Sequence, residues 1–140
     1  MSKKVLIFSG SDRVGSFNTQ VAEQFAVAIS GYSDFAAEVY DYADVPLLNE
    51  DIEFPTPEQV VRLRAAIDEA AAVLFVSPEY NGSYPARMKN LIDWASRKQT
   101  QDGTPSVLVD KKVAIAAAAY ASFGSHVREN LLRLLPFTKA

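Results

Sequence analysis

The stretch VLIFSGSDRVGSFN, residues 5–18, leads a short apolar run directly into a loop of small and polar residues. The run at residues 5–9 is continuously apolar and ends in a small residue, as strands buried on both faces of a parallel sheet do. A helix is expected to start at Asn18 and to end near Gly31, with a buried face formed by Val21, Phe25, Ala28 and Ile29. A strand followed directly by a helix is the repeating unit of α/β proteins.

Related patterns recur along the rest of the chain. Apolar runs at residues 73–77 and 113–118 match the first, and we expect these three runs to form the central strands. The more polar residues 35–41 suit an edge strand. Because helices with one apolar face are expected between these runs, the sequence predicts an α/β fold. The expected architecture is a doubly wound, mostly parallel sheet with helices on both faces.

Individual residues set the expected boundaries and packing of the later helices. Thr56 is expected to cap the second helix, with Pro57 at its first position and Gln59 completing a capping box. The third helix is expected to start at Pro85 and the fourth near Ser125. Their predicted apolar stripes, in chain order, are Val60, Leu63, Ile67 and Ala70, then Met88, Leu91, Ile92 and Ala95, then Val127, Leu131, Leu134 and Leu135.

Bulk composition limits the classes of function. The 140 residues suit one domain, residues 1–140, and the net charge of -3 makes nucleic acid a poor partner. The chain has no cysteine, which excludes disulfides and thiolate metal sites, and its single histidine, His126, is expected at the surface rather than on a metal. The apolar run near the N-terminus is too short for a membrane span, so we expect a soluble, cytoplasmic protein with no membrane partner.

The loop GSDRVGSFN, residues 10–18, has the chemistry of an anion-binding turn. Small residues let the backbone approach a phosphate, the helix start offers unpaired N–H groups, and short side chains and one arginine add donors: Ser11, Arg13, Ser16 and Asn18. Gly10 and Gly15 have the spacing of a nucleotide triphosphatase loop, but Ser16 stands where that loop needs lysine. The alternative is a polar turn in which Ser16 or Asn18 only caps the helix.

A second loop, SPEYNGSYP at residues 77–85, also joins an apolar strand to a helix. Pro78 and Gly82 shape the backbone, and Tyr80 and Tyr84 offer flat surfaces, so this loop is suited to a planar ring. The alternative is an ordinary turn whose tyrosines pack on a neighbouring subunit. The third loop, residues 119–125, is small and flexible apart from Tyr120 and Phe123, and it carries little information by itself.

Together the two motifs resemble those of the NADPH-dependent FMN reductase family, which includes quinone, azo-dye and chromate reductases. GSDRVGSFN looks like the family's phosphate loop, and SPEYNGSYPARMKNLIDW, residues 77–94, looks like its second signature. The resemblance implies a flavodoxin-like fold that binds FMN. The implied flavin-binding residues are Gly10, Ser11, Arg13, Ser16, Asn18, Pro78, Glu79, Tyr80, Asn81, Ser83 and Ser122.

The resemblance also implies a reaction. NADPH or NADH would pass hydride to flavin N5, and the electrons would leave to a small-molecule acceptor in a ping-pong scheme: a quinone, an azo compound, chromate or free flavin. No side chain is expected to be catalytic, because the flavin carries the chemistry. Two alternatives stay open: an FMN-binding electron-transfer flavoprotein without NAD(P)H oxidation, and an inactive flavodoxin-like scaffold.

The C-terminal part departs from the family pattern. The turn after the fourth strand is not rich in glycine, and the fifth strand and closing helix that family members usually have are missing before Ala140. An exposed sheet edge next to a buried strand favours association, so we expect a homodimer or homotetramer. Two places are open for Trp94, the core or a subunit contact against Tyr80 or Tyr84 of a partner, and the enrichment of aromatic residues at interfaces favours the contact.

Overall fold

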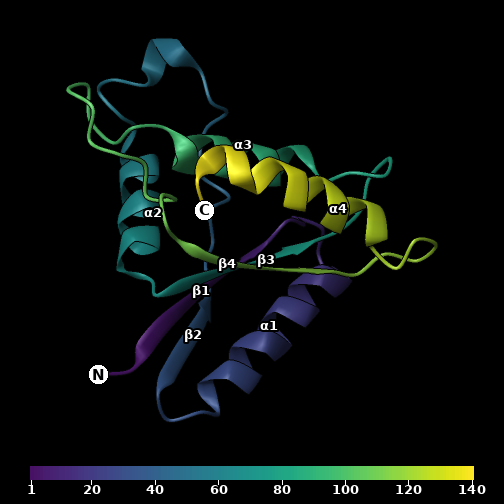
Figure 1. Ribbon diagram of the computed structural model, residues 1–140. Coiled ribbons are helices and arrows are strands. Elements are labelled where there is room, and N and C mark those ends of the chain that lie inside the picture. Colours follow the sequence, from purple (N-terminus) through teal and green to yellow (C-terminus); the bar gives the residue numbers. More distant parts are fainter.

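Strands and helices alternate along the whole chain in the computed structural model, which describes residues 1–140 (Figure 1). The predicted α/β order is confirmed. None of the helices has the length and apolar character needed to cross a bilayer. The elements are β1 (Lys3–Ser9), α1 (Phe17–Ser30), β2 (Phe35–Val39), a 3-10 turn (Glu50–Ile52), α2 (Glu58–Glu69), β3 (Ala72–Ser77), α3 (Ala86–Ser96), β4 (Lys112–Ala117), α4 (Ser125–Leu134) and a second 3-10 turn (Leu135–Thr138).

The four strands form one parallel sheet in the order β2-β1-β3-β4. This order is the flavodoxin-like arrangement, in which ligands bind beyond the carboxyl ends of the strands next to β1. β1 and β3 are central, as predicted, but β4 lies at an edge, so the prediction of a third central strand was wrong. The apolar run of β4 consists largely of alanine, and such small residues suit a half-covered edge as well as a buried centre.

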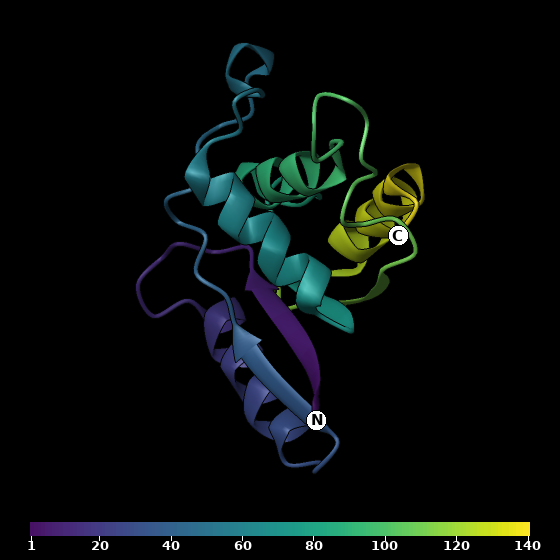
Figure 2. The same ribbon diagram turned by 90° about the vertical axis from the view of Figure 1, so that its left-hand side faces the viewer.

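Helices cover both faces of the sheet. Figure 2 shows α1 on one face and α2, α3 and α4 on the other. The three-helix face holds the larger core, where Phe8 and Phe75 stack 5.9 Å apart between ring centroids. The α1 face holds a small core of Ile7, Ala22, Leu74 and Val76.

The buried face of α1 matches the predicted one only in part: Val21 and Ile29 pack against the small core as expected, but Phe25 and Ala28 do not. Phe25 is 37% exposed and Ala28 is also exposed, whereas Asn18 and Ala22 are buried. The reason is close packing, because the small side chains of Ala22 and Ala26 let α1 approach the sheet. The large apolar side chain of Phe25 therefore misled the prediction.

The start of α2 also differs. Pro57 is the residue before the helix rather than its first residue, and no side chain caps α2. The Thr56 hydroxyl instead donates to the Glu53 carbonyl at 2.8 Å. The predicted capping box was therefore wrong, because a local turn takes the capping hydroxyl.

Trp94 lies in the core and not at a subunit contact, so that prediction was wrong. Its side chain is completely buried, and its indole N–H donates to the Pro46 carbonyl at 2.8 Å. The long connection between β2 and α2 folds over α3, where Leu48 N–H also donates to the Asn90 side chain at 2.7 Å. This connection covers the indole within the same chain.

Candidate functional site

The first and second loops meet at the carboxyl edge of the sheet because β1 and β3 are neighbours. Gly10 lies at the contact between them, and its N–H donates to the Val76 carbonyl at 2.8 Å. A Cβ atom on Gly10 would lie 3.0 Å from Met88 Cε, 3.1 Å from Pro78 Cδ and 3.2 Å from Pro85 Cγ. Glycine at this position therefore allows the two loops to touch.

A hollow of about 420 Å³ opens between these loops, the start of α1 and the end of β4. We call it the central hollow. Its volume lies in the range of roughly 300–1,000 Å³ that is usual for small-molecule sites. The residues that line it are Ser11, Arg13, Ser16, Phe17, Asn18, Pro78, Glu79, Tyr80, Ala118, Ala119 and Tyr120.

The helix start at one end of the central hollow offers free donors. The Ser16 hydroxyl caps α1 by accepting the Thr19 N–H at 3.4 Å, as the capping alternative predicted. The N–H groups of Phe17 and Asn18 take part in no hydrogen bond within the chain. Unpaired N–H groups and the helix dipole favour an anion here.

Arg13 is exposed beside this helix start. Its guanidinium donates to the carbonyls of Val14 and Gly15, both at 3.3 Å, and lies 5.8 Å from the centroid of the Phe17 ring. These bonds to exposed loop carbonyls are weakly held, so an anion at the helix start can compete for the guanidinium.

Asn18 connects two distant parts of the site. Its side-chain amide donates to the Ala118 carbonyl at 3.0 Å, and its side-chain oxygen accepts the Ala118 N–H at 3.0 Å. Asn18 thereby holds the start of α1 against the end of β4, which forms the opposite wall of the central hollow.

The second loop is a tight hairpin at the other end of the hollow. The backbones of Tyr80 and Ser83 exchange two hydrogen bonds, of 2.9 and 3.0 Å. Asn81 and Gly82 between them have φ angles of 51° and 72°, and Asn-Gly is the residue pair that such a turn favours. The turn presents Tyr80, which is 54% exposed, at the mouth of the hollow.

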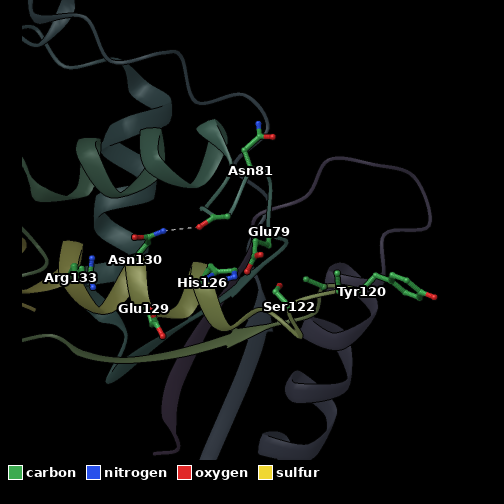
Figure 3. A pocket seen from close by; sticks show the side chains of 11 residues that line it. Glu79, Asn81, Tyr120, Ser122, His126, Glu129, Asn130 and Arg133 are labelled. Carbon is green, nitrogen blue, oxygen red and sulfur yellow. Dashed lines mark hydrogen bonds between the residues drawn. The ribbon is translucent and has the colours of Figure 1, made fainter.

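Glu79 connects the second and third loops (Figure 3). Its carboxylate accepts the Val127 N–H at 3.0 Å and so caps α4, which has no cap of its own. A hydrogen bond from the Ser122 hydroxyl, helped by the Val127 N–H and by His126, lowers the pKa of Glu79 below its ordinary value. The carboxylate is therefore held ionised at the wall between two hollows.

The second hollow, of about 880 Å³, lies beside the first on the α4 side, and we call it the outer hollow (Figure 3). It shares Glu79, Ala119 and Tyr120 with the central hollow. On its floor the Asn130 side chain donates to the Gly82 carbonyl at 2.7 Å. Its lining is mostly polar and is completed by Asn81, Gly82, Ala121, Ser122, His126, Glu129, Asn130 and Arg133.

The structure brings together most of the residues singled out in the sequence. Those that line the central hollow are Ser11, Arg13, Ser16, Asn18, Pro78, Glu79 and Tyr80. Asn81 and Ser122 line the outer hollow, whereas Gly10 lies behind the loops and Ser83 closes the hairpin.

Four lining residues were not among the predicted flavin-binding residues, although three of them lie in loops that the sequence singled out: Phe17, Ala118, Ala119 and Tyr120. Residues 118–120 follow β4, and the general rule for carboxyl ends of strands points to them. Gly124 was also missed. It has a φ of 73°, and a Cβ atom there would lie 2.5 Å from Ala117 Cβ, so glycine lets α4 start against β4.

The fold and the paired loops define a flavodoxin-like α/β protein with a candidate ligand site beyond the carboxyl ends of β1 and β3. The sequence model of the NADPH-dependent FMN reductase family matches residues 3–139, and the chain belongs to this family.

Known relatives agree with this assignment. The chain is 36% identical over 131 residues to 2-hydroxy-1,4-benzoquinone reductase of Burkholderia sp, covering 91% of this chain and 69% of the relative. It is 38% identical to a quinone reductase of Pseudomonas putida, covering 93% and 70%. The structure of FerB, a flavoenzyme NAD(P)H:(acceptor) oxidoreductase of Paracoccus denitrificans, superposes with a TM-score of 0.86 at 29% identity, covering 97% and 72%.

Proposed function

We propose that this chain binds FMN in the central hollow and uses NAD(P)H to reduce quinones or related small acceptors. The observation that carries the proposal is the junction of the two loops at Gly10, which puts an anion-binding helix start and a ring-sized turn on one hollow. The chain's family membership supports the cofactor and the donor. When bound, the flavin would supply the redox chemistry by accepting a hydride from the donor and giving electrons to the acceptor.

The first loop would hold the FMN phosphate. The free N–H groups of Phe17 and Asn18 fit a phosphate at the start of α1. The hydroxyls of Ser11 and Ser16 line the same end, and Arg13 adds a positive charge. These donors and the positive charge suit a dianion better than a neutral ligand.

The second and third loops would hold the ring. Pro78 and Tyr80 line the hollow as flat, apolar surfaces, which suits one edge of an isoalloxazine system. The backbone N–H groups of residues 119–123 make no hydrogen bond within the chain. Oriented free donors beside the ring would stabilise negative charge that develops on it. Glu79 would fix this loop by capping α4 and would not act as a base.

The outer hollow would admit the nicotinamide donor and then the acceptor, in keeping with a ping-pong scheme. It opens onto the central hollow through Glu79, Ala119 and Tyr120. The names of the Burkholderia and Pseudomonas relatives support a quinone as the acceptor class.

Anaerobic stopped-flow mixing tests this function. Protein loaded with FMN is mixed with NADPH or NADH, and the visible flavin absorbance is followed. Rapid bleaching, with recovery on addition of a benzoquinone, is the expected result. Slow bleaching by NAD(P)H together with ready reduction by dithionite would mean an electron carrier. Protein that takes up no FMN would be an inactive scaffold.

We further propose that the protein works in the cytoplasm as a homodimer or homotetramer. Large aromatic side chains are exposed around the site, and Tyr80, Tyr120 and Phe123 are 54%, 100% and 79% exposed. Exposed apolar groups gathered in one region favour a protein partner. Light scattering that finds a heat-stable monomer would contradict the oligomer.

A further inference from the structure

Arg87, in the first turn of α3, makes contacts that the flavin site described above does not explain. One end of its guanidinium forms an ion pair with Asp12 in the first loop, and the other lies 3.9 Å from the Asp41 carboxylate. The face of the guanidinium lies over the Tyr42 ring, 3.9 Å from its centroid. Arg87 thus links the start of α3 to the loop after β1 and to the segment after β2.

The support under Arg87 is rigid. Tyr42 is 3% exposed, and its hydroxyl donates to the Ser9 carbonyl at 2.7 Å, at the end of β1. The Nε atom of Arg87 is buried and has no hydrogen-bond partner within the chain. A cation held over an aromatic face keeps its charge in such a site, and its remaining N–H groups point to carboxylates.

Residues 11–15, between the two ends of the first loop that are held by Gly10 and Asn18, have no other polar anchor to a distant segment. Every other hydrogen bond or ion pair of residues 11–15 goes to residues 9–20. Residues 12–15 are exposed, and Gly15 has a φ of 69° with open space where a Cβ atom would stand. The Asp12–Arg87 ion pair is therefore the single polar link from this loop to the second loop and α3.

We propose that Arg87 is a positioning residue for the phosphate loop: by binding Asp12 it fixes residues 11–16 in the conformation that receives the phosphate of FMN. This inference rests on the proposed function. Arg87 itself does not line the central hollow, so it acts through Asp12. The pair also neutralises the Asp12 carboxylate, which would otherwise repel an incoming dianion.

The test compares binding of FMN and of riboflavin, which lacks the phosphate, to the apoprotein. The variants are Arg87→Met, Asp12→Asn and the double variant, with Arg62→Met as the matched control. Arg62 forms ion pairs with Asp44 and Glu58 on the surface, away from both hollows. Flavin fluorescence titration gives each dissociation constant, and far-UV circular dichroism checks folding.

Each single variant is expected to bind FMN about tenfold more weakly, since the charge-assisted link that orders the phosphate loop is lost, and to bind riboflavin within about twofold of the unsubstituted protein. The double variant should be no weaker than either single variant, because both remove the same link. Three results would each overturn the proposal: unchanged FMN binding in Arg87→Met, equal or tighter binding in Asp12→Asn, or an equal loss for riboflavin. If Arg87→Met does not fold, Arg87→Lys replaces it. This variant is expected to bind FMN about threefold more weakly and riboflavin unchanged, and FMN binding equal to that of the unsubstituted protein would overturn the proposal.

A measurement without flavin separates this inference from the proposed function. Hydrogen–deuterium exchange of residues 11–16 in the apoprotein is expected to be faster in Arg87→Met and Asp12→Asn than in Arg62→Met. Equal exchange in all three variants would overturn the inference. If the unsubstituted protein binds neither flavin, the proposed function fails, while the exchange result still decides whether Arg87 orders the loop.

Discussion

Replacing Gly124 by alanine tests how closely α4 must start against β4. The left-handed φ of 73° costs an alanine about 1–2 kcal/mol. The new Cβ would lie 2.5 Å from Ala117 Cβ, and relieving such overpacking costs about 1–3 kcal/mol. Gly124→Ala is therefore expected to lower the free energy of unfolding by about 2–5 kcal/mol.

A second substitution separates the two causes. In an Ala117→Gly background the opposing methyl group is gone, so adding Gly124→Ala should cost only the backbone part, about 1–2 kcal/mol. Urea unfolding measures each free energy, with Trp94 fluorescence as the probe because this completely buried residue is the only tryptophan. Equal losses in the two backgrounds would refute the methyl–methyl contact, and a loss below about 0.5 kcal/mol in both would refute the whole argument.

Substitutions at three further positions give distinct outcomes. Arg13→Met should weaken FMN binding about tenfold and Arg13→Lys by less, because lysine keeps the positive charge but cannot offer two parallel donors to a phosphate; Arg13→Lys binding as tightly as the unsubstituted protein in a fluorescence titration would argue against a forked contact. Glu79→Gln should lower the melting temperature most near neutral pH, and the difference should shrink as pH falls below the ordinary glutamate value of 4.5, because the lowered pKa of Glu79 stabilises the fold only while it is ionised. A difference that grows on acidification would contradict this sign. Trp94→Phe should cost about 1–2 kcal/mol in urea unfolding followed by circular dichroism, since the hydrogen bond to the Pro46 carbonyl is lost; a cost near zero would mean that the indole N–H contributes nothing.

Local chemistry made much of the fold predictable. Apolar runs that end in small residues marked β1 and β3, and the alternation of strands with amphipathic helices gave the layers. The Asn81-Gly82 pair favours a tight hairpin because both residues readily take the positive φ angles that the turn needs. Each of these features depends on sequence neighbours only.

Features that depend on distant contacts could not be predicted in this way. The buried face of α1 is set by how closely Ala22 approaches the sheet, and Trp94 is covered by a loop that begins some 50 residues earlier in the chain. The link between Asp12 and Arg87 is a tertiary contact with no sequence pattern of its own. The capping of α4 by Glu79 is similar, because the carboxylate and the helix belong to different loops.

The two hydrogen bonds between Asn18 and the Ala118 backbone span 100 positions of the chain. During synthesis, the Asn18 side chain can form these bonds only after the ribosome has synthesised and released β4 and Ala118. Contacts of such long range are late and slow events in folding. The central hollow, where FMN is proposed to bind, is therefore incomplete in any chain that ends before residue 118.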